Sequence, residues 1–358
     1  MRIFFFTGVD VNDPSFGGAK GSKSRYEILK KLADVDIFIL QKRSDLASML
    51  SLLQGHYPPM RNVILREIVD KIRNGNYDIV FIDTSVCGEL VKAIKEIIPT
   101  IPVFAYFQNC EYDWIDVRFL GKRTIKSTIY RSYVKKSEKN TAKYSDICAA
   151  LSKRDCTRIE ELYGIVPNVI LPLFIRDEAE VDDFEYNQNK YALLFGPTEP
   201  ANIEGFKWFI ENVSPHINIK TVLAGKGFEK YKEELSSKKV DVIGYVDDIH
   251  ELYKKAACVC IPLFNGGGMK IKTVEAMMFG KTIFGTDEAF AGYDVEYTHL
   301  GGLCNNAQEY IKKINSYLNE HKETFNKYSR HLYENVYSEK AALDSYKKLL
   351  KRLSNCIY

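Results

Sequence analysis

Short apolar runs alternate with longer amphipathic stretches along this chain, and this alternation constrains the fold more than any single motif. In the first half, the apolar runs expected to form strands are Arg2–Thr7, Asp36–Leu40, Asp78–Ile82, Val103–Tyr106 and Ile147–Leu151. The stretches expected to form helices are Ser22–Leu32, Met60–Arg73, Glu89–Ile97 and Thr124–Lys143. Strands that alternate with helices predict a parallel sheet covered by helices on both faces.

The alternation stops near residues 172–190 and then starts again. Residues 177–185 are acidic and have no clear period, so we interpret 176–189 as a linker between domains at 1–175 and 190–335. In the second domain, the expected strands are Tyr191–Phe195, Lys220–Ala224, Val240–Ile243, Val259–Pro262 and Thr282–Phe284. The expected helices are Asn202–Asn212, Glu229–Leu235, Asp248–Ala256, Lys270–Phe279 and most of 307–352, and residues 336–358 are expected to pack back on the first domain. Two such units predict a ligand site in a cleft between them, at the carboxyl ends of the strands.

Composition excludes several classes of protein. The chain has 358 residues, of which 46% are hydrophobic and 27% charged, so a disordered chain, a collagen-like repeat and a small disulfide scaffold are excluded. It has no apolar run of membrane-spanning length, and its first residues indicate a strand rather than a signal peptide. Its eight cysteines show no CxxC spacing, which favours buried thiols in a reducing cytosol, and the scattered histidines predict no metal site. We therefore expect a cytoplasmic protein.

Charge is concentrated in one segment of the first half. Between Arg118 and Lys143 there are nine basic residues and a single acid, Glu138, so this segment carries +8 in a chain whose net charge is +3. Such a patch suggests an anionic partner, either a lipid diphosphate or the membrane surface at the inner face of the plasma membrane, and contact with that membrane is our hypothesis. A solvated helix face is the alternative. Nucleic acid is not expected, because aromatic residues do not interleave with the basic ones.

A glycine-lysine-glutamate segment carries the clearest chemical signal. Gly266, Gly267 and Gly268 follow an expected strand, and Lys270 and Lys272 lie in the first turn of the expected helix. Glycine lets the backbone approach a ligand, and a helix N-terminus favours an anion. Basic residues at that end are disfavoured unless an anion is bound, so a diphosphate site is favoured over a flexible turn with solvent-facing lysines. Glu275, one turn later, could accept hydrogen bonds from the paired hydroxyls of a ribose.

Several blocks of the second half, in this order, resemble the group 1, or family 4, glycosyltransferases. The blocks are Gly196–Phe209, Leu223–Gly227, Ile243–Ile249, Ala257–Pro262, the glycine-lysine-glutamate segment and Thr286. The resemblance implies an α/β fold of the GT-B type, with two Rossmann-like parallel-sheet domains facing a cleft. It also implies a retaining, metal-independent transferase that moves a sugar from a UDP- or GDP-sugar to a glycan or a lipid-linked polysaccharide precursor, with no further cofactor.

The resemblance also assigns site residues. The catalytic candidates are Lys270, Lys272, Glu275 and Gln108. The candidates for binding the nucleotide-sugar are Gly17, Gly18, Gly196, Thr198, Glu199, Gly225, Gly227, Val246, Gly266, Gly267, Gly268, Met269 and Glu275.

Three positions depart from the pattern of the family. Gly267 stands where many members have the first of two glutamates, and Phe264 stands where a subgroup with the same glycine-lysine spacing often has arginine. Gln108 stands where many members have histidine. Glutamine cannot exchange a proton near neutral pH, so it is expected to orient a sugar hydroxyl rather than act as an acid or base. Asn109 and Glu111 are nearby candidates, for which a role in capping the loop remains an alternative.

Other functions remain open at this point. Asp34 and Asp36 have the Asp-x-Asp spacing of metal-dependent, single-lobed transferases, although they are more simply the start of the second strand. The fold also serves nucleotide-sugar enzymes that transfer nothing, such as epimerases. The departures at Gly267 and Gln108 would also fit an inactive, binding-only subunit.

Overall fold

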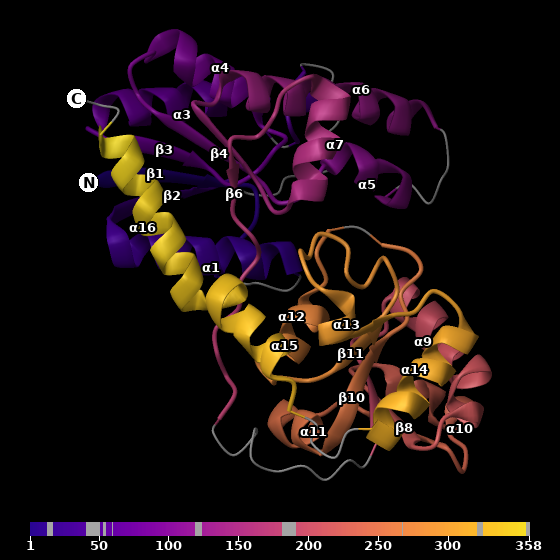
Figure 1. The fold of residues 1–358 in the computed structure, drawn as a ribbon. Helices are drawn as coiled ribbons and strands as arrows, with labels where there is room; N and C mark the ends of the chain where they lie inside the picture. The colour runs from indigo at the N-terminus through magenta and orange to yellow at the C-terminus, as the bar shows by residue number, and fades with distance from the viewer. Residues whose placement is uncertain are drawn as a thin grey trace. The chain divides into compact units, whose positions relative to one another are not determined.

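The computed structural model describes residues 1–12, 17–40, 51–52, 55–58, 60–118, 124–180, 191–266, 268–320 and 325–355. The chain divides into two compact units. The first unit comprises Met1–Leu173 together with Ala342–Tyr358, and the second comprises Phe174–Ala341 (Figure 1). Much of the expected linker, residues 181–189, lies outside the described residues.

The first unit is built on a parallel sheet of six strands in the order β2-β1-β3-β4-β5-β6. Along β1, Phe4 and Phe6 face one side of the sheet and pack with α3 and α4, whereas Phe5 faces the other side and contacts Tyr26 of α1. The strands are β1 (Arg2–Thr7), β2 (Asp34–Ile39), β3 (Ile79–Ile82), β4 (Val103–Phe107), β5 (Ile147–Ala150) and β6 (Val169–Ile170). The helices are α1 (Gly17–Leu32), α3 (Asn62–Asn74), α4 (Gly88–Ile97), α5 (Glu111–Arg118), α6 (Ile125–Tyr144), α7 (Lys153–Tyr163) and most of α16 (Glu339–Asn355).

The second unit repeats this plan with the strand order β12-β11-β10-β7-β8-β9, again all parallel. Its strands are β7 (Tyr191–Phe195), β8 (Lys220–Ala224), β9 (Val240–Gly244), β10 (Ala256–Ile261), β11 (Ile283–Gly285) and β12 (Gly301–Leu303). Its α-helices are α9 (Pro200–Asn212), α10 (Lys232–Leu235), α11 (Ile249–Lys255), α12 (Ile271–Met278), α13 (Tyr297–Leu300), α14 (Ala307–Glu320) and α15 (Lys327–Leu332). Short 3₁₀ turns at Ser214–His216 and Phe228–Tyr231 and a π-turn at Tyr333–Tyr337 complete it.

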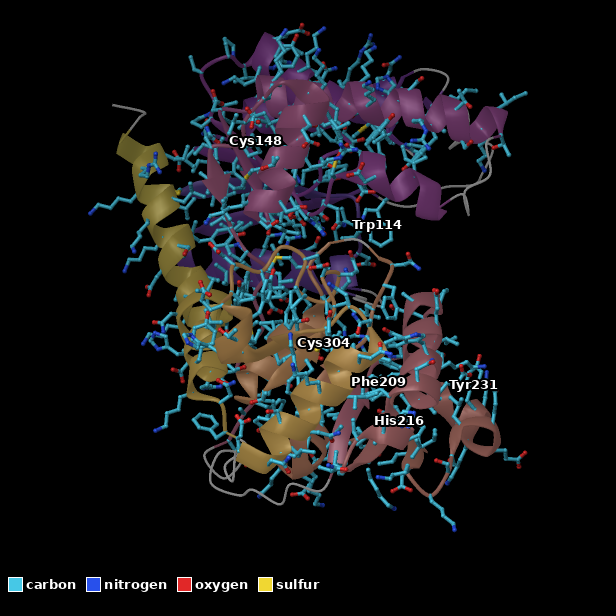
Figure 2. The ribbon with its side chains drawn as sticks, turned by 45° about the vertical axis from the view of Figure 1, so that its right-hand side comes forward. Trp114, Cys148, Phe209, His216, Tyr231 and Cys304 are labelled. Carbon is cyan, nitrogen blue, oxygen red and sulfur yellow. The ribbon has the colours of Figure 1, made fainter. Side chains whose placement is uncertain are left out.

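The core of the second unit lies where α9 and α14 cover one face of its sheet. Phe206 and Phe209 of α9 and Tyr310 and Ile314 of α14 are fully buried there. They pack with Cys304 and with buried side chains of five strands, β7 to β11. Figure 2 shows Phe209 and Cys304 within this packed layer and Cys148 inside the first unit. The two α/β units with parallel sheets predicted from the alternation are therefore present.

The elements that differ from the sequence prediction are mostly short. The structure adds α5, α7, β6, α13 and β12, which carry weak or brief apolar patterns. Helix α1 begins at Gly17, so Gly17 and Gly18 lie in its first turn and not in a loop before it. The expected helix Glu229–Leu235 is divided into a 3₁₀ turn followed by α10.

Candidate functional site

The strand order of the second unit reverses between β7 and β10, and most of the predicted donor residues follow these two strands. Gly196, Thr198 and Glu199 come directly after β7, and residues 262–270 connect β10 to α12. In open parallel sheets, ligands bind outside the carboxyl ends of the strands at this switch point. The topology therefore brings the two groups of predicted residues to one edge of the sheet.

Glycines hold the loops at this edge close together. A Cβ atom on Gly225 would lie 1.8 Å from the carbonyl oxygen of Gly196, which leaves no room for any side chain. Gly227 has a φ of +93°, and a Cβ there would lie 2.2 Å from Thr198 Oγ1. Because only glycine accommodates both the contact and the backbone angle, the loops after β7 and β8 pack against each other. Val246 lies just beyond β9 at the same end of the sheet and is partly exposed.

Lys272 occupies the centre of this arrangement. Its Nζ donates a hydrogen bond to Asn202 Oδ1 and lies 5.1 Å from the ring centroid of Phe206. A Cβ atom on Gly196 would lie 2.9 Å from this Nζ, so the lysine reaches directly across the loop. Burial lowers the pKa of Lys272 to about 8, although Glu199 and Glu275 raise it, and Lys270 lowers it further. Among the residues that the structure describes, Lys272 forms no ion pair.

Lys270 has a different environment from Lys272. It forms an ion pair with Glu288, on the segment after β11, and its Nζ donates a hydrogen bond to the carbonyl oxygen of Gly268 at 2.8 Å. The backbone carbonyl of Lys270 accepts a hydrogen bond from the Tyr293 hydroxyl at 2.7 Å. Gly266 is exposed and Met269 is buried. Lys270 therefore connects the glycine loop to the segment that follows β11. Gly267 lies outside the described residues.

The N-terminus of α12 points to an anion site as well. Lys270 stands at its N-cap position without a side-chain cap, and the first turn holds no acidic residue. Thr273 donates its hydroxyl hydrogen to the carbonyl oxygen of Ala289 at 2.8 Å and so offers nothing to the helix end. Uncapped amide groups beside the Lys272 ammonium group can receive a multiply charged oxyanion. Glu275, partly buried, follows Lys272 by one turn.

Gln108, the catalytic candidate of the first unit, is engaged in a largely buried polar network. Gln108 Nε2 donates hydrogen bonds to Ser22 Oγ at 2.9 Å and to Asp83 Oδ2 at 3.2 Å. Arg25 Nε donates to Asp83 Oδ1 at 2.6 Å, and both side chains of this ion pair are almost fully buried. Sequence reasoning missed Arg25, Ser22 and Asp83. The only signal for them was the position of Asp83 directly after the apolar run that forms β3.

Glu138, the single acid of the basic segment, does not lie on the surface of that segment. The residue is fully buried on the inner side of α6, where its carboxylate accepts hydrogen bonds from the amides of Glu111 and Tyr112 at 2.9 and 3.1 Å. The Tyr163 hydroxyl donates a further bond at 2.6 Å. Burial raises the pKa of Glu138 to about 7, and these donors only partly oppose the shift. Glu138 therefore holds the start of α5 rather than neutralising the exposed lysines.

The Asp34–Asp36 pair starts β2, as the simpler interpretation predicted. Asp36 accepts hydrogen bonds from the Tyr77 hydroxyl at 2.6 Å and from Arg2 at 2.8 Å. Over the described ranges, no group of three or more histidine, cysteine, aspartate or glutamate side chains is arranged to hold a metal ion. Within the same ranges, each helix is too short or too polar to cross a bilayer.

Comparisons with known proteins agree with this geometry. Residues 189–320 match the model of the family described as "Glycosyl transferases group 1". No significant match was found among the curated proteins.

Three solved structures resemble the whole chain. HepE of Anabaena, solved with UDP, is 14% identical over 98% of this chain and 100% of its own, with a TM-score of 0.67. Sucrose-phosphate synthase from Thermosynechococcus elongatus is 13% identical over 99% of each chain, with a TM-score of 0.71. A glycosyltransferase from Rickettsia africae is 15% identical over 98% of each chain, with a TM-score of 0.69. At these identities the likeness shows the GT-B fold alone.

Proposed function

We propose that the protein transfers a sugar from a nucleotide-sugar to a hydroxyl group, on the premise that residues 189–320 match the model of the group 1 glycosyltransferases. The observation that carries this proposal is the environment of Lys272. Beside an uncapped helix N-terminus, this partly buried cation forms no ion pair with any residue that the structure describes. A buried charge is costly unless an opposite charge matches it. The diphosphate of the donor supplies that match.

In the proposed reaction, negative charge develops on the diphosphate as its bond to the sugar breaks. The Lys272 ammonium group and the first-turn amides of α12 stabilise that charge, and the loop of Gly266 and Gly268 lets the phosphates approach the backbone. Glu275 would accept hydrogen bonds from the ribose hydroxyls. We propose that the sugar keeps its anomeric configuration. We also propose that these protein groups make a metal unnecessary, so activity should persist in excess EDTA.

A thermal-shift screen tests the donor. HepE has been solved with UDP and with UDP-glucose, which makes UDP the first probe for this chain and GDP the second. A ligand present at 100 times its Kd should raise the unfolding free energy by about 2.7 kcal/mol. An unchanged melting temperature with UDP, GDP, ADP and their sugars would contradict the proposal.

Product analysis then separates transfer from its alternatives. Incubation of the stabilising donor with glycan and lipid-linked acceptors should yield nucleoside diphosphate and a glycosylated acceptor. An epimerised donor formed without acceptor would indicate a non-transferring enzyme. Tight donor binding without any turnover would indicate a binding subunit.

For the acceptor we propose a glycan or a lipid-linked polysaccharide precursor at an anionic membrane surface, which the first unit would contact through α6. The outward face of α6 carries Ile125, which is 83% exposed, Ile129, and the exposed lysines Lys126, Lys135, Lys136, Lys139 and Lys143. With Glu138 turned inward, no acidic side chain of α6 opposes them. The unit as a whole has 30 basic and 21 acidic residues, or +9, against 20 basic and 26 acidic residues, or −6, in the second unit.

Vesicle sedimentation at low salt tests this contact. We expect the protein to sediment with vesicles of phosphatidylglycerol and phosphatidylcholine but not with phosphatidylcholine alone. A variant with Lys136, Lys139 and Lys143 changed to Glu should lose this binding. Changing Lys347, Lys348 and Lys351 of α16 to Glu alters the unit's charge by the same amount and should preserve most of it. An equal loss of vesicle binding in both variants would contradict a specific role for α6. Two further basic residues of the segment, Lys122 and Arg123, lie outside the described residues.

A further inference from the structure

We propose that Asn202 is a positioning residue of the donor site, whose amide oxygen fixes the Lys272 ammonium group beside Gly196 without neutralising its charge. The inference rests on the proposed function and assigns a role to a residue that the sequence pattern did not single out. It follows from the geometry of Asn202, from the chemistry of an amide partner, and from the charges that face Lys272.

The Asn202 side chain is held at both ends of its amide. It is 3% exposed, its Nδ2 donates a hydrogen bond to the carbonyl oxygen of Pro197 at 2.8 Å, and its Oδ1 accepts one from Lys272. The bond to Pro197 fixes which end of the amide faces the lysine. Gly196 completes the arrangement, since a Cβ there would lie 2.9 Å from Lys272 Nζ and 3.0 Å from Asn202 Nδ2. Asn202 thus links the loop after β7 to the first turn of α12.

A neutral partner has a chemical consequence for the lysine. The Asn202 amide oxygen carries no formal charge and accepts one of the three ammonium hydrogens of Lys272. The ammonium group therefore keeps its positive charge and two further donor hydrogens for a phosphate oxygen. A carboxylate at the same place would form an ion pair with Lys272 and would repel the diphosphate.

The charged groups that face Lys272 are Glu199 at the start of α9 and Glu275 and Lys270 around α12. Both carboxylates favour the charged ammonium group and so raise the pKa of Lys272. Burial, reinforced by Lys270, outweighs the two carboxylates and lowers this pKa to about 8. Affinity for an anion should therefore be highest below pH 8 and fall as the pH rises above it, because the free lysine then loses its proton. The residue at position 202 therefore determines the pH at which the affinity for the anion falls.

The sharpest test is Asn202→Asp with Asn212→Asp as the matched control. Both substitutions add one negative charge to α9, but Asn212 is exposed and bonds only to the carbonyl oxygen of Trp208. The pKa of Lys272 is measured by NMR on protein with ¹³C-labelled lysine, assigned with Lys272→Arg. Binding of UDP and of inorganic pyrophosphate is measured by calorimetry from pH 6 to pH 10.

We expect Asn202→Asp to raise the pKa of Lys272 and to weaken both probes about tenfold or more at pH 7, while Asn212→Asp changes neither. Asn202→Leu, which removes the oxygen without adding charge, should lower the pKa of Lys272 and move the fall in affinity to lower pH. An unchanged lysine titration in Asn202→Asp, or unchanged affinity despite a shifted titration, would overturn the role of Asn202. If the wild type binds neither UDP nor pyrophosphate, the proposed function fails, and the titration still reports whether the contact exists.

Discussion

Each unit of this protein places a cation beside the switch point of its sheet, but the two cations have partners of different chemistry. One partner is a carboxylate and the other is a neutral amide. In the first unit, Arg25 on α1 meets Asp83 just beyond β3 in a buried ion pair. In the second unit, Lys272 on α12 meets Asn202 on α9. Burial alone would lower the pKa of Arg25, but Asp83, together with Tyr106 and Tyr346, more than offsets burial, and the pKa is raised. The pKa of Lys272 is lowered instead.

This difference distinguishes a cation that stabilises the fold from a cation that we propose binds an anionic ligand. A buried charge matched by a carboxylate within the chain contributes to the fold and has little attraction left for a ligand. A buried charge matched only by an amide destabilises the ligand-free protein, and an arriving anion relieves that cost. Mutations of the Arg25–Asp83 pair should therefore change mainly the free energy of unfolding, and mutations of Lys272 should change mainly the affinity for the ligand.

The largest effect is expected for Asp83→Asn. It leaves Arg25 buried without its countercharge, so the free energy of unfolding should fall by about 3–5 kcal/mol in chemical denaturation. Nucleotide affinity of the folded protein should stay as in the wild type. Asp70→Asn breaks the exposed pair of Asp70 with Arg73 in the same unit and should cost less than about 0.5 kcal/mol. Similar losses of unfolding free energy in the two variants would show that a buried ion pair contributes no more to stability here than an exposed one.

Lys272→Met should have the opposite profile. We expect affinity for the donor and turnover to fall about 10²–10³-fold, because one preorganised donor to the diphosphate is lost. Unfolding free energy should be equal to or above that of the wild type, since a partly buried ammonium group is removed. Lys238→Met, at an exposed lysine of the same unit, is the control and should change neither. A variant that unfolds more easily yet binds donor normally would reverse our assignment of the two cations.

The sequence predicted the strands of both sheets best where an apolar run is uninterrupted. Tyr191–Phe195 and Lys220–Ala224 form strands with the predicted bounds. Helix α5 was missed because it is short and its start is held by Glu138, a contact across 27 residues that no local pattern reveals. The register of such distant contacts is set by packing, which local periodicity does not encode.

The predicted donor residues of the second unit come together at one edge because parallel strands place their carboxyl ends there. Gly196 and Lys272 were predicted separately, and the structure shows them in contact. Asn202 could not be assigned in advance, since its partner lies 70 residues away and asparagine at a helix start has a simpler capping role. Nor could the sequence show that Lys270 forms an ion pair with Glu288, whereas Lys272 forms none with the residues that the structure describes.

Glu138 extends the comparison to a buried carboxyl group that accepts hydrogen bonds but, over the described ranges, has no cation as an ion-pair partner. Its pKa of about 7 lies above that of an unfolded glutamate, so the folded protein holds the proton to higher pH. The free energy of unfolding should therefore decrease between about pH 4.5 and pH 7, by about 1–3 kcal/mol, and level off above that range. Urea denaturation across this range measures it. Glu138→Gln should remove most of this dependence, and an unaltered slope in that variant would assign it to another group.

The smallest effect is expected at the edge of the first sheet, where charges are paired but exposed. Tyr77 donates a hydrogen bond to Asp36, which lowers the pKa of that carboxyl group, and Arg2 lowers it further. Tyr77→Phe removes this donor, and water and Arg2 can replace it. Unfolding free energy should fall by only about 0.5 kcal/mol at pH 7, because an exposed carboxylate is well solvated without it. Since a lowered pKa stabilises the fold only above it, the difference between Tyr77→Phe and the wild type should vanish in acid. A loss of several kcal/mol would mean that pairing, rather than burial, determines how much a charged group contributes, and the contrast between Arg25 and Lys272 would then need another explanation.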